Sequence, residues 1–392
     1  MVATSIMTRA AVFCRDAEAL DTIRQALSAF PEIESSFSSQ GIRAAIKDVA
    51  RIADCRLLIV DLVDEDDPLL AFRELSELVS PATAIIVLGR NNDIRLYRTL
   101  KQAGAAEYFF TPLVRDLLTQ TIRDAGFGKA NTTNPRAAKL LFFLGVRGGC
   151  GVTTLALRTA ALLSRSPPRP VFLMDLNLRY SDMALQLDLP PNGAVYEALD
   201  NADSIDELFL ERTLTHVTPT LDMMTTLDPL DRPVRLEEEA LLTLFGKLGQ
   251  RYRYIMAEVP PMGVMSMRNV ISMPCTFVLV SDGRMSSARD VARWRAWFGE
   301  MGEGRTLLHV LNQYNAPKSL PLDQITELAG AEPDIVIPYS RDAEANSVYG
   351  LRDDSLFKEL DAGLAPLISV LSGGATGQKP GLASRVKTWL KL

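Results

Sequence analysis

The chain repeats one local pattern over most of its length: a short apolar run suited to a β-strand, then a segment whose apolar residues recur at helical spacing. In the first third of the sequence the apolar runs are RAAVF, RLLIV, TAIIVL and EYFF, with a weaker run over residues 34–37. Helical segments follow the four stronger runs, starting near residues 17, 68, 92 and 112. Strands that alternate with helices of this length form parallel, doubly wound sheets. We therefore expect residues 1–126 to form an α/β domain with five strands.

A second domain is expected after a break in this pattern. Residues 127–137 are rich in Gly, Asn and Thr and carry almost no large apolar side chain, which predicts a linker. The strand pattern then resumes in KLLFFLGV, PVFLMD, TLDMMTTL, YRYIMAEV, CTFVLV, TLLHVLN and DIVIP. The intervening helices include one with a capping box at Ser204 and Glu207 and an amphipathic one over residues 286–301. Residues 138–372 are therefore predicted to form a second doubly wound domain with seven strands, followed by a tail at 373–392.

Composition narrows the class of protein. A chain of 392 residues that is 47% apolar and 23% charged is typical of two globular domains. The net charge is −6 and the basic residues are scattered, which argues against a nucleic-acid partner. The 4 cysteines lie far apart without a CxxC pair, so we expect neither a disulfide framework nor a zinc site. Because the sequence has no signal-peptide pattern and no apolar run near the length of a spanning helix, we expect a cytoplasmic protein.

A glycine-rich turn follows the first strand of the second domain and opens a helix, in VRGGCGVTTLALRTAALL. Glycines in this position let backbone N–H groups converge on phosphate oxygens, and the start of the helix adds a partial positive charge. The Thr153 hydroxyl is the candidate ligand for magnesium. A tight turn without any ligand would also explain the glycines, but two further motifs at the ends of later strands favour a nucleotide site.

These motifs resemble the MinD/ParA family of deviant P-loop ATPases, whose loop reads K-G-G-x-G-K-[ST]-[ST]. The family's D-x-D motif is matched by Asp175-Leu176-Asn177, and its D-x-P-P motif by Glu258-Val259-Pro260-Pro261. The resemblance covers about residues 138–370 and implies that ATP or ADP binds with magnesium, the metal lying near Thr153, Asp175 and Glu258. The loop positions are Arg147, Gly148, Gly149, Cys150, Gly151, Val152, Thr153 and Thr154.

Both family lysines are replaced. Val152 cannot bond to phosphate oxygens, and losing a hydrogen bond to a charged group should weaken nucleotide affinity by about one to two orders of magnitude. Arg147 keeps the positive charge of the lysine that reaches across the family's dimer. Asn177 cannot accept a proton as the second aspartate does, and the extra methylene of Glu258 moves its carboxylate. We therefore expect Asp175, Asn177 and Glu258 to form a degenerate catalytic set, with weak nucleotide binding and hydrolysis that is slow or absent.

The first domain resembles a response-regulator receiver domain, with Asp61 at the phosphoacceptor position after the third strand. That family also has an acidic pair after its first strand, a Ser or Thr after its fourth and Lys-Pro after its fifth. Here those places hold Cys14-Arg15-Asp16, Gly89 and Thr111-Pro112. The resemblance therefore implies that Asp61 is a degenerate phosphoacceptor and that the domain serves docking or dimerisation.

The two domains together resemble the TadZ/CpaE family of Tad (Flp) pilus assembly proteins, over about residues 9–372. This resemblance implies a homodimeric scaffold that localises the pilus secretion machine, often at the cell pole, beside its secretion ATPase. The loss of both lysines goes further than the usual family pattern. Two alternatives remain open: an active MinD/ParA-type positioning ATPase, and a response regulator whose output is the second domain.

The last eleven residues, LASRVKTWLKL, have an amphipathic helical pattern. Leu382, Val386, Trp389 and Leu390 follow one another at helical spacing, and basic residues lie outside that stripe. The pattern predicts a short basic helix that orders against a membrane or a protein surface. The expected location is cytoplasmic, with peripheral contact at the inner membrane through this tail or, as the TadZ/CpaE resemblance implies, at the cell pole.

Overall fold

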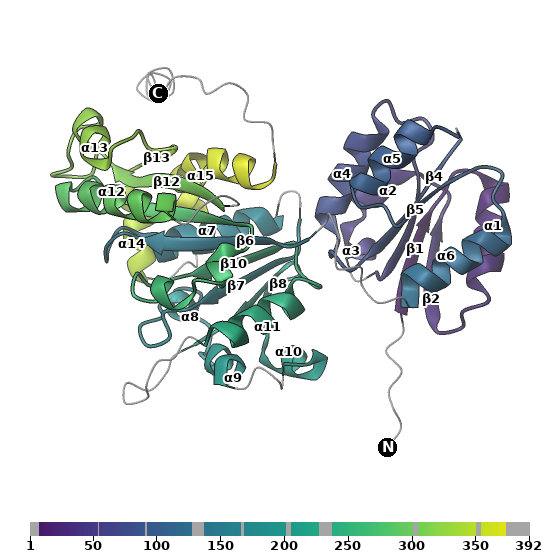
Figure 1. Cartoon of the computed structure of the whole chain (residues 1–392), viewed down its shortest axis with the longest axis horizontal. Helices are drawn as coiled ribbons and strands as arrows, with labels where there is room; N and C mark the ends of the chain where they lie inside the picture. The colour runs from purple at the N-terminus through teal and green to yellow at the C-terminus, as the bar shows by residue number, and fades with distance from the viewer. Residues whose placement is uncertain are drawn as a thin grey trace.

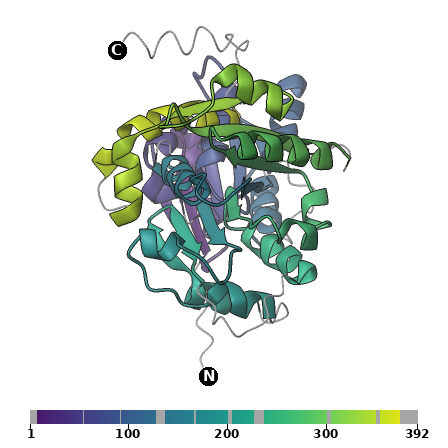
Figure 2. The same cartoon turned by 90° about the vertical axis from the view of Figure 1, so that its left-hand side faces the viewer.

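A computed structural model of the chain describes residues 8–373, except 54, 91, 128–136, 166–167, 201–204, 227–236, 301–304 and 350–353. It contains two separate sheets, one in each half of the chain, each with helices packed against it (Figure 1). Figure 2 shows the second domain in front of the first. The expected fold class, two doubly wound α/β domains in succession, is confirmed.

The first domain has a five-stranded parallel sheet in the order β2-β1-β3-β4-β5. All five expected strands are present, and β3 is buried along its whole length. Two apolar clusters, one on each face of the sheet, form the core. The elements are β1 (Thr8–Phe13), α1 (Ala17–Leu27), β2 (Ile33–Ser38), α2 (Ile42–Lys47), α3 (Val49–Ile52), β3 (Leu57–Asp61), α4 (Pro68–Leu78), β4 (Ala84–Gly89), α5 (Ile94–Gln102), β5 (Glu107–Phe110) and α6 (Arg115–Phe127).

The second domain has an eight-stranded sheet in the order β13-β12-β11-β6-β10-β7-β9-β8. Its first half contains β6 (Lys139–Gly145), α7 (Val152–Arg165), β7 (Val171–Asp175), α8 (Met183–Gln186), α9 (Ala194–Asp200), α10 (Glu207–Thr213), β8 (Thr215–Thr218), β9 (Leu221–Met224), α11 (Glu238–Leu248) and β10 (Tyr254–Glu258). Its second half contains η2 (Val264–Ser266), η3 (Val270–Ser272), β11 (Cys275–Ser281), α12 (Met285–Glu300), β12 (Arg305–Tyr314), α13 (Leu322–Ala329), β13 (Ile335–Pro338), α14 (Arg341–Tyr349), η4 (Asp354–Phe357) and α15 (Lys358–Leu371).

The prediction of seven strands in this domain is wrong, because β8 adds an eighth. It pairs antiparallel with β9 at the edge of the sheet, whereas the other pairings are parallel. Its sequence, THVT, is short and mostly polar, and none of its side chains is fully buried. A strand at an edge needs no apolar run, so the pattern used for the other strands could not detect it.

The capping box at Ser204 and Glu207 is also wrong. Asp206 is the residue before α10, and its Oδ1 accepts a hydrogen bond from the backbone N–H of Phe209 at 2.7 Å. Glu207 is therefore the first helical residue, while Ser204 lies outside the described residues. Aspartate is as good a cap as serine, so the helix start was recognisable but was assigned to the wrong residue.

The parallel arrangement brings the carboxyl ends of β6, β7, β10 and β11 to one edge of the second sheet. This edge lies on the side of the second domain that faces away from the first domain (Figure 1). Within the described residues, we find no helix with the length and apolar character needed to cross a bilayer. The predicted tail helix lies outside the described residues.

Candidate functional site

The glycine-rich loop connects β6 to α7 at the carboxyl edge of the second sheet. Gly149 and Gly151 have φ angles of +80° and +84°, in the left-handed region that favours glycine. A Cβ atom on Gly151 would also lie 2.5 Å from Nδ2 of Asn312. That amide donates a hydrogen bond to the carbonyl oxygen of Cys150 at 2.9 Å, so β12 helps to hold the loop in shape. Gly148 has open space where a side chain would be.

Three of the predicted site residues come together beside this loop. Asp175 and Glu258 are register partners at the ends of the neighbouring strands β7 and β10, and both are buried. The Thr153 hydroxyl donates a hydrogen bond to Oε1 of Glu258 at 3.1 Å. Oε2 of Glu258 is buried and has no hydrogen-bond partner among the described residues. The arrangement therefore offers two carboxylates and a hydroxyl at one point.

The two carboxylates perturb each other. Burial, and then the neighbouring Asp175, raise the pKa of Glu258 to about 8. Burial also raises the pKa of Asp175 to about 6, although hydrogen bonds from Ser181 and from the backbone N–H of Asn177 oppose the rise. Such a pair holds a proton near neutral pH unless a cation lies beside it. Carboxylate and hydroxyl oxygens are ligands that magnesium takes in proteins, so these residues fit a magnesium ion.

Val152 takes no part in this polar cluster. Its side chain packs against the apolar cluster that includes Leu155 of α7 and Phe143 of β6. A Cβ atom on Gly145 would lie 3.0 Å from its Cγ1, so the isopropyl group points back at the end of β6. At the position where the MinD/ParA family has a phosphate-binding lysine, this chain therefore has a valine that packs against the core.

Arg147 is the only basic residue of the eight loop positions, and it is bonded within its own chain. Its Nε lies 2.8 Å from Oδ2 of Asp290 on α12. Arg289 and Arg293 lie 3.0 and 3.4 Å from the other oxygen of the same carboxylate. The Arg147 side chain is nevertheless 41% exposed, so its charge remains accessible from the loop face.

Asn177 is held in the turn that follows β7. Its backbone N–H donates to Oδ1 of Asp175 at 2.8 Å, and its side-chain amide donates to the carbonyl oxygen of Tyr180 at 3.3 Å. A carboxamide is too weakly basic to take a proton from water, whatever hydrogen bonds it makes. The structure thus brings Asn177 to the site without giving it a proton-accepting role.

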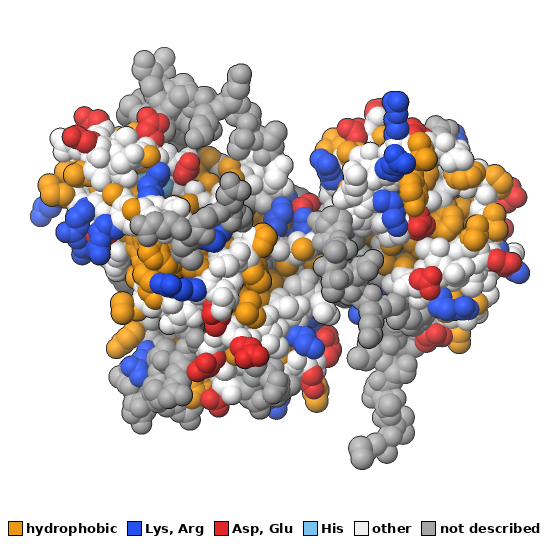
Figure 3. Space-filling view, in the orientation of Figure 1, with side chains coloured by type: hydrophobic (Ala, Val, Ile, Leu, Met, Phe, Trp, Pro, Cys, Tyr) orange, Lys and Arg blue, Asp and Glu red, His pale blue; other side chains and the backbone are white. Residues whose placement is uncertain are grey.

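Sequence reasoning missed a set of exposed apolar side chains around the loop. They come from the segments after β7, β10 and β11, which end at the same edge of the sheet as the loop. We call them the apolar rim: Tyr180, Leu185, Met262, Met265 and Met285. Apolar and basic side chains appear along this edge of the second domain in Figure 3. Exposed apolar groups that cluster mark interaction surfaces, and the run PPMGVMSM after β10 was a signal for them.

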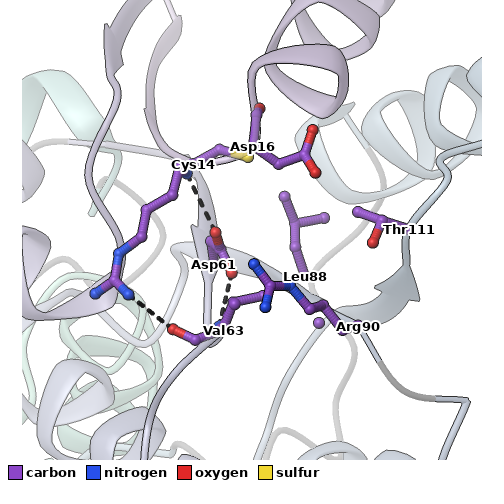
Figure 4. Close-up of a pocket in the computed structure, with 9 residues that line it drawn as sticks. Cys14, Asp16, Asp61, Val63, Leu88, Arg90 and Thr111 are labelled. Atoms are coloured by element: carbon purple, nitrogen blue, oxygen red, sulfur yellow. Dashed lines mark hydrogen bonds between the residues drawn. The ribbon is translucent and has the colours of Figure 1, made fainter.

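The first domain has a small hollow, of about 80 Å³, around Asp61 (Figure 4). Oδ2 of Asp61 accepts the backbone N–H of Arg15 at 3.1 Å, and Oδ1 accepts the backbone N–H of Val63 at 2.7 Å. The Arg15 guanidinium donates to the carbonyl oxygen of Val63 at 3.0 Å. Both oxygens of the candidate phosphoacceptor are therefore engaged by the chain itself.

The other receiver positions do not complete a phosphorylation site. Oδ1 of Asp16 accepts the backbone N–H of Ala19 and so caps α1. A Cβ atom on Gly89 would lie 2.3 Å from the Tyr108 hydroxyl, so the tyrosine fills the space that a Ser or Thr would need. Thr111 lines the hollow on the side away from Val63 (Figure 4). The hydroxyl of Thr111 brings no charge to balance a phosphoryl group.

The sequence matches no protein-family profile and no curated protein. Among solved structures, the chain is similar to a ParA family ATPase from Chlorobium tepidum, with 20% identity, 61% of this chain and 97% of that chain covered, and a TM-score of 0.50. It is also similar to the septum site-determining protein MinD complexed with Mg-ADP from Pyrococcus horikoshii, with 17% identity, 61% and 96% coverage and a TM-score of 0.49.

A third similar structure is the pilus assembly protein CpaE from Caulobacter crescentus, with 26% identity, 29% of this chain and 95% of that chain covered, and a TM-score of 0.27. Because the Chlorobium structure and this chain share 20% of their residues, their similarity establishes the fold. Activity and partners have to be argued from the site. The second domain has the fold of the ParA/MinD P-loop ATPases, and the first has a five-stranded doubly wound sheet in the flavodoxin-like strand order.

Proposed function

We propose that this protein is a localisation and assembly scaffold for a Tad (Flp) pilus secretion machine. In this proposal its second domain binds ATP or ADP weakly and hydrolyses it slowly or not at all. Thr153, Asp175 and Glu258 would hold the magnesium ion, and the backbone N–H groups of the loop would contact the phosphates. The sequence resemblance to the TadZ/CpaE family supplies the pilus context.

The observation that carries the proposal is the position of Val152. The loop keeps the backbone shape of a phosphate site, with its two left-handed glycines, but the side chain at the lysine position is a partly buried valine that packs against the core. Asn177, bonded to the turn, adds a second loss at the position of the water-orienting aspartate. A phosphate loop that keeps its fold but lacks the family's lysine and second aspartate favours nucleotide binding or dimerisation over ATP hydrolysis.

We further propose that the scaffold is a homodimer formed through the loop face. The apolar rim follows strands that end at the same edge of the sheet as the loop, and Arg147 keeps a cation where relatives reach across the dimer. The pilus machinery, including its secretion ATPase, would be the partner, with no role for nucleic acid. The protein would lie in the cytoplasm, at the inner membrane or the cell pole, and the basic tail would contact the membrane surface.

One observation favours the second candidate, an active MinD/ParA-type positioning ATPase. The hydrogen bond between Thr153 and Glu258 keeps a magnesium-ready arrangement that a pure scaffold does not need. The response-regulator alternative gains no such support, because both oxygens of Asp61 are bonded to backbone N–H groups.

Complementation of pilus assembly separates these candidates. In cells that lack the protein, the wild-type chain should restore pili. A Thr153→Ala variant should restore them equally if the protein is a scaffold, because turnover is not needed. Leu208→Ala, an exposed change on α10 away from the loop, is the matched control. Loss of pili with a folded Thr153→Ala protein that still binds ADP as the wild type does would favour the active ATPase and refute the proposal.

A further inference from the structure

The two domains meet at the edge of the second sheet that lies opposite the glycine-rich loop. On the first domain, the contact is made by the end of α4 and the residues that follow it. On the second domain, it is made by the residues that begin β6 and β10 and precede β7. We call this contact the junction, and its central residue is Glu77, whose side chain is 18% exposed.

Four side chains of the second domain converge on the Glu77 carboxylate. Arg253 donates to Oε1 from Nε at 3.2 Å and from Nη2 at 2.5 Å. The Tyr254 hydroxyl donates to Oε2 at 2.9 Å. Lys139 lies 3.5 Å from Oε1 and Arg169 lies 3.8 Å from Oε2. Both arginines are less than one-tenth exposed, so water screens these ion pairs weakly.

Backbone contacts extend the junction on both sides of Glu77. The Ser80 hydroxyl and the Ala82 backbone N–H both donate to the carbonyl oxygen of Gln250, at 2.6 and 3.3 Å. Lys139 also donates to the carbonyl oxygen of Leu371, the last residue of α15, at 3.1 Å. The first domain therefore sits on a surface built from several elements of the second domain.

We infer that Glu77 is a latch that fixes the first domain against the amino edge of the second sheet, so that the two domains move as one body. A carboxylate that accepts a two-nitrogen arginine contact and a tyrosine hydroxyl holds a defined orientation as well as a distance. Exposed ion pairs contribute little, but a buried, multiply bonded charge is costly to remove because its partners lose their bonds together.

The charge state of Glu77 agrees with this geometry. Burial by itself would raise its pKa, but the Arg253 hydrogen bond and the nearby Lys139 outweigh burial, and the pKa is lowered. The carboxylate is therefore ionised at neutral pH. Each domain has its own apolar core, so breaking the junction should release the first domain without unfolding either one.

The placement has a consequence for assembly. Lys139 and Tyr254 begin the two strands whose other ends carry the glycine-rich loop and Glu258. The first domain is thus held at one edge of the sheet while the apolar rim stays free at the opposite edge. A partner bound to the first domain and a protein bound at the loop face would therefore be held at a fixed distance and orientation from each other. This inference does not depend on what either face binds.

The test is a distance measurement between the domains in the full chain. Spin labels at Gln120→Cys on α6 and Lys247→Cys on α11 would report the distance by pulsed electron resonance, since both positions are exposed. The four native cysteines are buried and should resist labelling. Glu77→Arg and Glu77→Ala test the latch. The control is Glu74→Arg, on the same helix but paired with Arg43 inside the first domain.

The latch predicts one narrow distance in the wild type and in Glu74→Arg, and loss of that single distance in both Glu77 variants. Near-ultraviolet circular dichroism would confirm that each variant is folded. If Glu77→Arg misfolds, Glu77→Ala still carries the test. A broad distribution in the wild type, or a narrow one retained in the Glu77 variants, would overturn the inference.

Discussion

Replacing Glu258 with glutamine should stabilise the second domain, by an amount that depends on pH. The amide keeps the shape of the side chain and removes the charge that repels Asp175. In the wild type, the folded protein holds a proton on Glu258 up to about pH 8, while the unfolded chain loses it near the ordinary value of 4.5. The stability of the wild type therefore falls as the pH rises from about 4.5 to 8, and the loss is complete above that window.

The size of the effect follows from the pKa difference. A rise from 4.5 to about 8, at about 1.4 kcal/mol for each pH unit, corresponds to about 5 kcal/mol. Asp175 shares the repulsion, so we expect Glu258→Gln to gain about 2 to 4 kcal/mol at pH 8 and close to nothing at pH 5. The hydrogen bond from Thr153 can persist, because the glutamine carbonyl oxygen still accepts it.

Urea unfolding at the two pH values, without magnesium or nucleotide, would measure the gain. Fluorescence of Trp294 and Trp297 reports the second domain, where both pack against the core. Glu239→Gln on α11 is the control, because that side chain is exposed. A gain of the same size at pH 5 and pH 8, or a loss at pH 8, would refute the claim that the carboxylate pair is strained by its charge.

Three further predictions concern the rest of the chain. Arg147→Ala should weaken nucleotide-dependent self-association in sedimentation velocity, and a wild-type chain that stays monomeric at tens of micromolar with and without ATP would count against the proposed dimer. Treatment with a small phosphodonor should leave Asp61 unmodified by mass spectrometry, because Thr111 stands where the receiver pattern has its lysine; a stoichiometric adduct would support the response-regulator alternative. A chain ending at Gly381 should sediment with acidic liposomes less than the intact protein does at low salt, and equal sedimentation would exclude the membrane role of the tail.

Most of the fold was predictable because its strands carry their own signals. Strands such as β3, β7 and β10 are buried along their whole length, so their sequences are continuous apolar runs. The edge strand β8 is mostly polar and has no such signal. It depends on pairing with β9, which a local pattern does not reveal.

The candidate site was predictable where its residues lie at strand ends. Thr153, Asp175 and Glu258 follow three apolar runs, and neighbouring parallel strands bring such ends together. The contacts that give the site its character were not predictable. Asp290 pairs with Arg147 from a helix more than 140 positions away, and Tyr108 occupies the space above Gly89 from another strand. These contacts join distant parts of the chain and leave no mark in local spacing.

ATP turnover by the purified full-length protein tests the central claim most directly. The wild-type chain should show magnesium-dependent hydrolysis at or near background, because Val152 packs against the core in place of a lysine and Asn177 is an amide held by its turn. Val152→Lys combined with Asn177→Asp restores the family's charges and should raise turnover above the wild type in the same assay. Brisk hydrolysis by the wild type, comparable to that of active ParA/MinD ATPases, would contradict the account and identify the protein as a working ATPase.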